Sequence, residues 1–150
     1  MATKKACILH TPQKKVDAEA VSKRLRAEGY DVRVTGVSIQ TAKSVEAGDR
    51  STLPPTAAEC LENATLCVIL VDEDGCLGTV GGLASDAGCR VITVGGSPDA
   101  LPNDLDDIAD GHVPSPDAPE LVEIAKGKDE RIAPDGTRAP PRKPNRVKCQ

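Results

Sequence analysis

Residues Leu66–Val71 read Leu-Cys-Val-Ile-Leu-Val, and this apolar run decides the fold class. A strand that is apolar at every position is typical of a parallel sheet covered on both faces, whereas a half-exposed strand alternates apolar and polar residues. At six residues it is also the longest apolar run in the chain. Because a membrane-spanning helix needs about 20 apolar residues, the sequence predicts no membrane span.

On both sides of this strand, short apolar strands alternate with helical patterns. Asp17 is a suitable N-cap for the first helix and Gly29 a suitable stop. The strands are predicted at Lys5–His10, Tyr30–Gly36, Leu66–Val71, Arg90–Val94 and Gly111–Val113. The alternation predicts an α/β fold: a flavodoxin-like open parallel sheet of five strands, in the order 2-1-3-4-5, with helices on both faces.

Charge divides the chain into three parts. Residues 1–50 carry a net charge of +4, residues 51–125 carry −13 with Arg90 as their one basic residue, and residues 126–150 carry +5. The last part is rich in proline and poor in apolar residues, so it is predicted to be a disordered basic tail. We therefore expect a folded domain over 1–126 and a tail over 127–150.

Composition excludes several classes of function. Tyr30 is the only aromatic residue, so base-stacking platforms and aromatic cages are excluded. The six cysteines include no C-x-x-C pair and no zinc-ligand spacing. Since the N-terminus lacks the apolar stretch of a secretory signal, we expect a cytoplasmic protein with reduced thiols, no metal site, and Cys149 as the most exposed thiol.

In an open parallel sheet, ligands bind beyond the carboxyl ends of the strands. The residues that follow the first, third and fourth predicted strands should therefore share one edge of the sheet, beside the start of the helix at Thr79. Glycine-rich loops there could offer backbone N–H groups to a phosphate, although no Walker or G-x-G-x-x-G motif is present. The candidate ligand-binding residues are His10, Thr11, Asp74, Thr79, Gly95, Gly96 and Ser97.

Asp72 and Glu73 are the candidate catalytic residues. Carboxylates at the end of a strand can hold ribose hydroxyls or act as a general base. The alternative is a solvated turn, with Asp72 capping backbone N–H groups and Gly75 permitting a positive φ. His10 likewise has two interpretations, as a hydrogen-bonded residue at a strand end or as a catalytic group.

Residues 61–71 (LENATLCVILV) and 82–92 (GLASDAGCRVI) resemble segments of the TIR superfamily and of the nucleoside 2-deoxyribosyltransferases. The similarity covers about residues 5–125. It implies a nucleotide-type ligand, with NAD or a nucleoside as the candidates. Both families carry a catalytic Glu on the helix before the second segment, and Val80 stands at that position here. The resemblance therefore implies a member without canonical NADase activity.

Three functions follow from these observations. The first is a TIR-like signalling or defence module that binds a nucleotide-type ligand or self-assembles, acting with a partner protein as an oligomer. The second is an enzyme that cleaves an N-glycosidic bond in NAD or a nucleoside, with Glu73 or Asp72 as its carboxylate. The third is weak nucleic-acid binding through residues 126–148.

The basic tail carries a separate expectation. Opposite charge should favour its docking on an acidic surface, in the same subunit or a neighbour. On this view, truncation after Ala125 leaves the domain folded and changes only its assembly.

Overall fold

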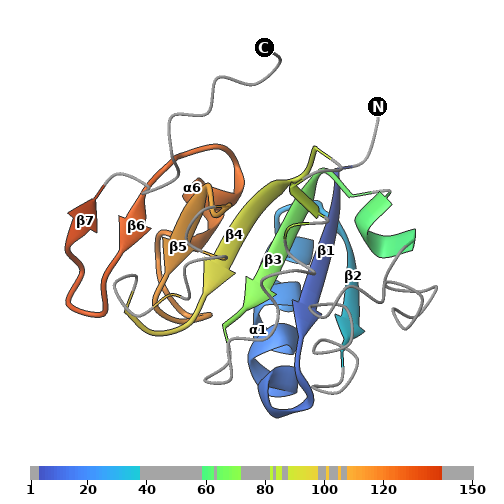
Figure 1. The fold of residues 1–150 in the computed structure, drawn as a ribbon, viewed down its shortest axis with the longest axis horizontal. Helices are drawn as coiled ribbons and strands as arrows, with labels where there is room; N and C mark the ends of the chain where they lie inside the picture. The colour runs from blue at the N-terminus through green and yellow to red at the C-terminus, as the bar shows by residue number, and fades with distance from the viewer. Residues whose placement is uncertain are drawn as a thin grey trace.

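The computed structural model describes residues 4–37, 59–62, 64–71, 82, 84–85, 88–97, 101, 105 and 108–139 (Figure 1). Its elements are β1 (Lys5–His10), the 3₁₀ turn η1 (Pro12–Lys14), α1 (Lys15–Ala27), β2 (Asp31–Gly36), β3 (Leu66–Leu70), β4 (Arg90–Val94), β5 (Gly111–Val113), α6 (Leu121–Ala125), β6 (Arg131–Ile132) and β7 (Arg138–Ala139). The five predicted strands are all present, with bounds within one residue of those predicted.

The strands form one open sheet in the order β2-β1-β3-β4-β5-β6-β7. Pairing is parallel from β2 to β6, and β7 pairs antiparallel with β6. The predicted order 2-1-3-4-5 is confirmed. The predicted count of five is wrong, because β6 and β7 extend the sheet through Ala139. Strands of two residues are too short to show the alternation of apolar and polar residues that predicts a strand, so β6 and β7 could not be recognised from the sequence.

The β6–β7 hairpin lies within the segment predicted to be a disordered tail. Its turn is closed by two backbone hydrogen bonds, from Ala133 N to Thr137 O and from Gly136 N to Ala133 O. Gly136 has φ of +89°, which glycine adopts at no steric cost. The part of the tail before residue 140 therefore belongs to the sheet, and the rest lies outside the described residues.

Two hydrophobic cores lie on opposite faces of the sheet. Along β3, Val68 belongs to the core that also contains α1 and α6 residues, and its neighbours Cys67 and Ile69 belong to the other. Residues 59–62 and Ala84 help cover this second face. Because successive side chains of a strand point to opposite faces, a strand buried on both sides must be apolar throughout. This accounts for the Leu66–Val71 run.

The first face is covered by α1, which lies behind β1 and β3 in Figure 1. Val21 and Leu25 of α1 are fully buried there. Arg24 ties the helix to the segment before α6, since its Nη1 donates to the carbonyls of Pro116 and Ala118 at 2.7 Å each. None of the helices that the structure describes has the length and hydropathy of a membrane span.

Ile69→Ala is expected to lower the free energy of unfolding by about 2–5 kcal/mol, because Ile69 is fully buried at the centre of the sheet. Leu70→Ala, on the opposite face, should cost a similar amount. Urea unfolding followed by circular dichroism measures both. Val16→Ala is the matched control, since Val16 is 77% exposed and its loss should change stability by less than about 0.5 kcal/mol. Unchanged stability in Ile69→Ala would contradict the central position of β3.

Candidate functional site

The structure describes part of the sheet edge at which ligand binding was predicted. β1, β3 and β4 are mutually parallel, so their carboxyl ends share one edge of the sheet. His10 and Thr11 end β1, while Gly95–Ser97 follow β4. Because β3 lies between these strands, the two groups are about 10 Å apart at the level of the backbone. Asp72, Glu73, Asp74, Thr79 and Val80 lie outside the described residues.

The loop after β4 is held by its own hydrogen bonds. The N–H of Gly95 donates to Val113 O and that of Gly96 to Pro114 O, each at 2.9 Å. These two amides are therefore already used and add no donors for a phosphate. The buried ring of His112 on β5 also fixes this loop, because its Nε2 donates to Gly96 O at 2.8 Å. Thr93 Oγ1 lies 2.8 Å from the other ring nitrogen, Nδ1.

His10 is held in one orientation at the end of β1. Its Nδ1 lies 2.7 Å from Thr11 O, and since a carbonyl only accepts, Nδ1 carries the hydrogen. In the neutral ring, Nε2 is then the unprotonated nitrogen. A Cβ at Gly36 would come within 3.3 Å of His10 Cε1. His10 therefore packs over the end of β2 and lines a cleft beyond it.

This cleft lies between α1 and β2 and has a volume of about 990 Å³. β2 is the edge strand, so the cleft lies at the border of the sheet. The cleft is lined by His10, Pro12, Lys15, Glu19, Ser22, Lys23, Arg26, Val34 and Gly36. Of the predicted ligand-binding residues that the structure describes, only His10 is among those lining it.

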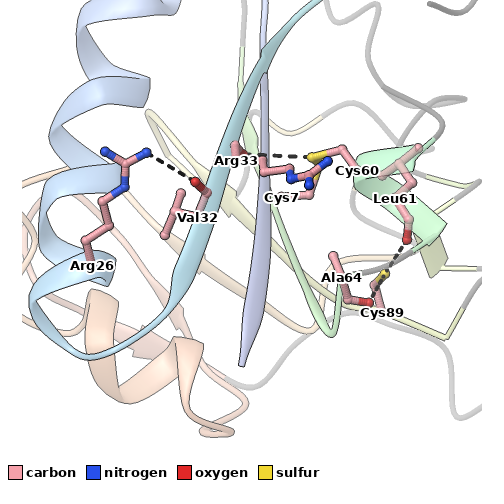
Figure 2. Close-up of a disulfide and its surroundings, with 8 residues drawn as sticks. All are labelled: Cys7, Arg26, Val32, Arg33, Cys60, Leu61, Ala64 and Cys89. Atoms are coloured by element: carbon pink, nitrogen blue, oxygen red, sulfur yellow. Dashed lines mark hydrogen bonds between the residues drawn. A yellow bond between two sulfur atoms is a disulfide. The ribbon is translucent and has the colours of Figure 1, made fainter. Parts of the chain in front are cut away.

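Three cations and one carboxylate face the cleft. Lys15, Lys23 and Arg26 are exposed, as is Glu19 between them on α1. None of the ion pairs formed within the described residues involves these side chains. Arg26 reaches from α1 to the edge strand, where Nη2 donates to Val32 O at 3.1 Å (Figure 2). The cleft therefore has a net positive charge that no neighbouring acid in the described structure neutralises.

Ser22 lies at the floor of the cleft and is 4% exposed. Its hydroxyl oxygen has no hydrogen-bond partner in the described structure. A buried hydroxyl without a partner costs about 1–3 kcal/mol, so this position is unfavourable unless something else satisfies it. The spacing of Lys15, Glu19, Ser22 and Arg26 places them on one face of α1. That polar stripe is the signal in the sequence that could have identified the cleft.

The cysteines on the second face correct the prediction of reduced thiols. Cys7 and Cys60 form a disulfide, with their Cα atoms 5.5 Å apart, and Cys60 Sγ lies 3.8 Å from Arg33 O (Figure 2). Cys67 and Cys89 are free and buried. Burial raises the pKa of both thiols above the ordinary value of 9.0. Both are protonated at neutral pH and therefore unreactive.

The Cys89 thiol holds the same helical turn that the disulfide anchors. Its Sγ donates to Leu61 O at 3.4 Å or Ala64 O at 3.2 Å. These four cysteines belong to one core, but no group of three or more metal-ligating side chains in the described part of the chain could hold a metal ion.

Basic residues of the predicted tail pair with acids of the body. Lys126 Nζ lies 2.8 Å from Glu28 Oε1, and this hydrogen bond raises the pKa of Lys126. Arg138 pairs with Glu120 of the body at 3.8 Å and with Glu130, which belongs to the predicted tail itself, at 3.1 Å. Docking of the tail on a neighbouring molecule stays a prediction.

No family model and no curated protein matches this chain. The resemblance to the TIR superfamily therefore stays a prediction.

Proposed function

We propose that the protein is a binding module for a small phosphate-bearing ligand, which it holds in the cleft between α1 and β2. The observation that carries the proposal is the set of three cations that line one cleft without an ion-pair partner in the described structure, together with Ser22 of the same lining, whose buried hydroxyl has no hydrogen-bond partner. Phosphate oxygens accept hydrogen bonds from Lys and Arg, and such charge-assisted bonds are about twice as strong as neutral ones. Of the functions expected from the sequence, this proposal corresponds to the first, a module that binds a nucleotide-type ligand.

The direction of α1 adds to the attraction. Pro12 and Lys15 place the start of this 13-residue helix at the cleft. The N-terminal end of a helix carries a partial positive charge, although the N–H groups of Lys14 and Lys15 are bonded to Thr11 O and Pro12 O in the preceding 3₁₀ turn. An anion at this end of the cleft would therefore meet the helix dipole as well as Lys15.

Binding without cleavage is favoured over catalysis by the chemistry of the lining. Among the described lining residues, Glu19 is the single carboxylate, whereas glycosidic-bond cleavage commonly uses a pair. The cleaving alternative rests on Asp72 and Glu73 alone. Incubation with NAD and with nucleosides distinguishes the two functions, because release of free base would establish the enzyme and overturn a purely binding role.

Self-assembly with a partner remains part of the proposal, with less support than ligand binding. Self-assembly was expected because the acidic body and the basic tail carry opposite charge. In the described residues, Lys126 and Arg138 already meet Glu28, Glu120 and Glu130 within the chain. Less charge is therefore left to hold a second molecule.

The double variant Lys15→Gln/Lys23→Gln is expected to lower affinity for inorganic pyrophosphate at least about tenfold, which corresponds to about 1.4 kcal/mol. The reason is that each substitution removes a cation facing the cleft. Isothermal titration calorimetry in 50 mM salt measures the dissociation constant. Binding by the wild type should also weaken as salt is raised to about 500 mM, where the Debye length is about 4 Å.

Lys4→Gln/Lys5→Gln is the matched control. It removes the same charge from exposed positions at the start of β1 that do not line the cleft, so it should leave affinity within about twofold. Equal losses in the two double variants would show a nonspecific charge effect and contradict the cleft as the site.

A further inference from the structure

The polar stripe on α1 changes sign along its length, and this limits what can occupy the cleft. Lys15 and Arg26 mark its two ends, and Glu19 and Ser22 lie between them. At 1.5 Å per residue, the stripe is about 16 Å long. The cleft thus offers cations toward its ends and, between them, a carboxylate and a hydroxyl.

Glu19 disfavours a ligand that is anionic throughout. It lies four residues from Lys15 and four from Lys23, the spacing at which helix side chains are neighbours. Nevertheless, Glu19 forms no ion pair with a described residue. A polyphosphate laid along the stripe would bring like charges together, which is unfavourable. An ionised carboxylate only accepts hydrogen bonds, so a ligand that covers the exposed Glu19 must supply donors in place of water.

Ser22 and His10 supply complementary groups. The Ser22 hydroxyl can both donate and accept, and it has no hydrogen-bond partner in the described structure. Because Nδ1 of His10 is bound to Thr11 O, Nε2 of the neutral ring is an acceptor. Donors that would satisfy Glu19, Ser22 and His10 without adding negative charge are hydroxyl groups of a carbon chain.

On the basis of the proposed function, we propose that the ligand is a sugar phosphate: a phosphate monoester whose carbon chain carries free hydroxyl groups. Lys23 and Arg26 hold its phosphate, and Glu19 and Ser22 determine specificity by binding its hydroxyls. The spacing of these residues suits such a ligand: Glu19 and Lys23 are one helical turn apart on α1, so one small molecule can contact both. A polyphosphate would satisfy the cations and leave Ser22 and Glu19 without a neutral partner.

Three probes separate these contributions in calorimetric titrations of the wild type: glucose 6-phosphate, ethyl phosphate and inorganic pyrophosphate. Glucose 6-phosphate and ethyl phosphate share the phosphate monoester, and only the first carries hydroxyls. We expect the wild type to bind glucose 6-phosphate at least about tenfold more tightly than ethyl phosphate, as one or two hydrogen bonds to a charged group would give.

Two variants test the assigned residues. Glu19→Gln should reduce the preference for glucose 6-phosphate over ethyl phosphate to less than about threefold and should strengthen pyrophosphate binding, because a repelling charge is removed. Ser22→Ala should reduce the same preference. Glu62→Gln is the matched control: it removes an exposed carboxylate that does not line the cleft, so the preference should be unchanged.

The outcomes distinguish the two proposals. If the wild type binds none of the three probes, the phosphate-binding function itself is wrong. If it binds all three, but with no preference for glucose 6-phosphate or with a preference that Glu19→Gln leaves intact, the sugar-phosphate inference is overturned and phosphate binding stands. Since Glu19 is exposed, Glu19→Gln keeps the test decisive even where Ser22→Ala lowers stability.

Discussion

Truncation after Ala125 is expected to lower the free energy of unfolding by at least about 3 kcal/mol, because it removes β6 and its buried side chain. Ile132 is 1% exposed and belongs to the core beneath α1 and α6. Truncating a buried Ile to Ala alone costs about 2–5 kcal/mol. This reverses the expectation from charge and composition, which treated the chain beyond Ala125 as dispensable for folding.

The same truncation also breaks polar contacts that hold β4 and β5. Arg90 Nη2 donates to Lys128 O at 2.7 Å, and Nη1 pairs with Asp129 at the same distance. The backbone N–H of His112 donates to Glu130 O at 3.0 Å. Without residues 126–150, Arg90 retains the bond to Ile124 O, and β5 becomes the edge of the sheet. These losses add to that of Ile132.

The measurement compares urea unfolding of residues 1–125, residues 1–139 and the full chain. We expect 1–139 to match the full chain, since it keeps both strands of the hairpin, and 1–125 to be much less stable or unfolded. Ile132→Ala in the full chain separates the apolar contribution from the rest. A 1–125 protein as stable as 1–139 would show that β6 and β7 contribute nothing to the fold.

The part of the fold that could be predicted from sequence is the part in which each strand carries its own pattern. Leu66–Leu70 is apolar throughout because it is buried on both faces, and the alternation with helices predicts parallel neighbours. By contrast, Arg131–Ile132 pairs through only two residues, and what holds it is tertiary: the pairing with β5, the burial of Ile132 and the nearby contacts of Arg90. No local pattern records such contacts.

The candidate site was less predictable, for a geometrical reason. Because ligands bind beyond the carboxyl ends of parallel strands, His10 and Gly95–Ser97 were candidate ligand-binding residues. The strands that they follow are indeed parallel. Whether a backbone N–H is free to bind a ligand depends on its neighbours, however. The N–H groups of Gly95 and Gly96 are already bonded to Val113 O and Pro114 O. The cleft is lined jointly by α1 and the edge strand β2, so it exists only once the helix has packed against the sheet. The polar stripe on α1 is the part of this site that can be recognised from the sequence.

The disulfide was hidden from sequence for a different reason. Cys7 and Cys60 are separated by 53 residues, and cysteine spacing without a framework does not determine pairing. The register of the sheet and the return of the chain at residues 59–62 bring them together. The prediction of reduced thiols rested on cysteine spacing and the lack of a secretory signal, neither of which reports on this pairing.

Reduction of Cys7–Cys60 is expected to lower the free energy of unfolding by about 4 kcal/mol, since the bond closes a loop of about 53 residues. The closed loop contains most of β1 and all of α1 and β2, and hence every residue that lines the cleft. Releasing it restores conformational freedom to the unfolded chain across this entire unit. The cleft is then held by packing and hydrogen bonds, among them the β1–β2 ladder and the bond from Arg26 to Val32 O.

Unfolding of the wild type with and without dithiothreitol measures the effect, and Cys60→Ala identifies the bond responsible. Cys60→Ala should unfold near the midpoint of the reduced wild type and should not respond to the reductant. Cys67→Ala removes a free buried thiol of the same core, so it should keep the full response to dithiothreitol even though its own stability is lowered. If the wild type is indifferent to the reductant while both variants merely lose stability, the bond does not constrain the unfolded chain. If Cys67→Ala rather than Cys60→Ala abolishes the response, a different pair of cysteines is bonded. The disulfide would then close a different loop of the chain.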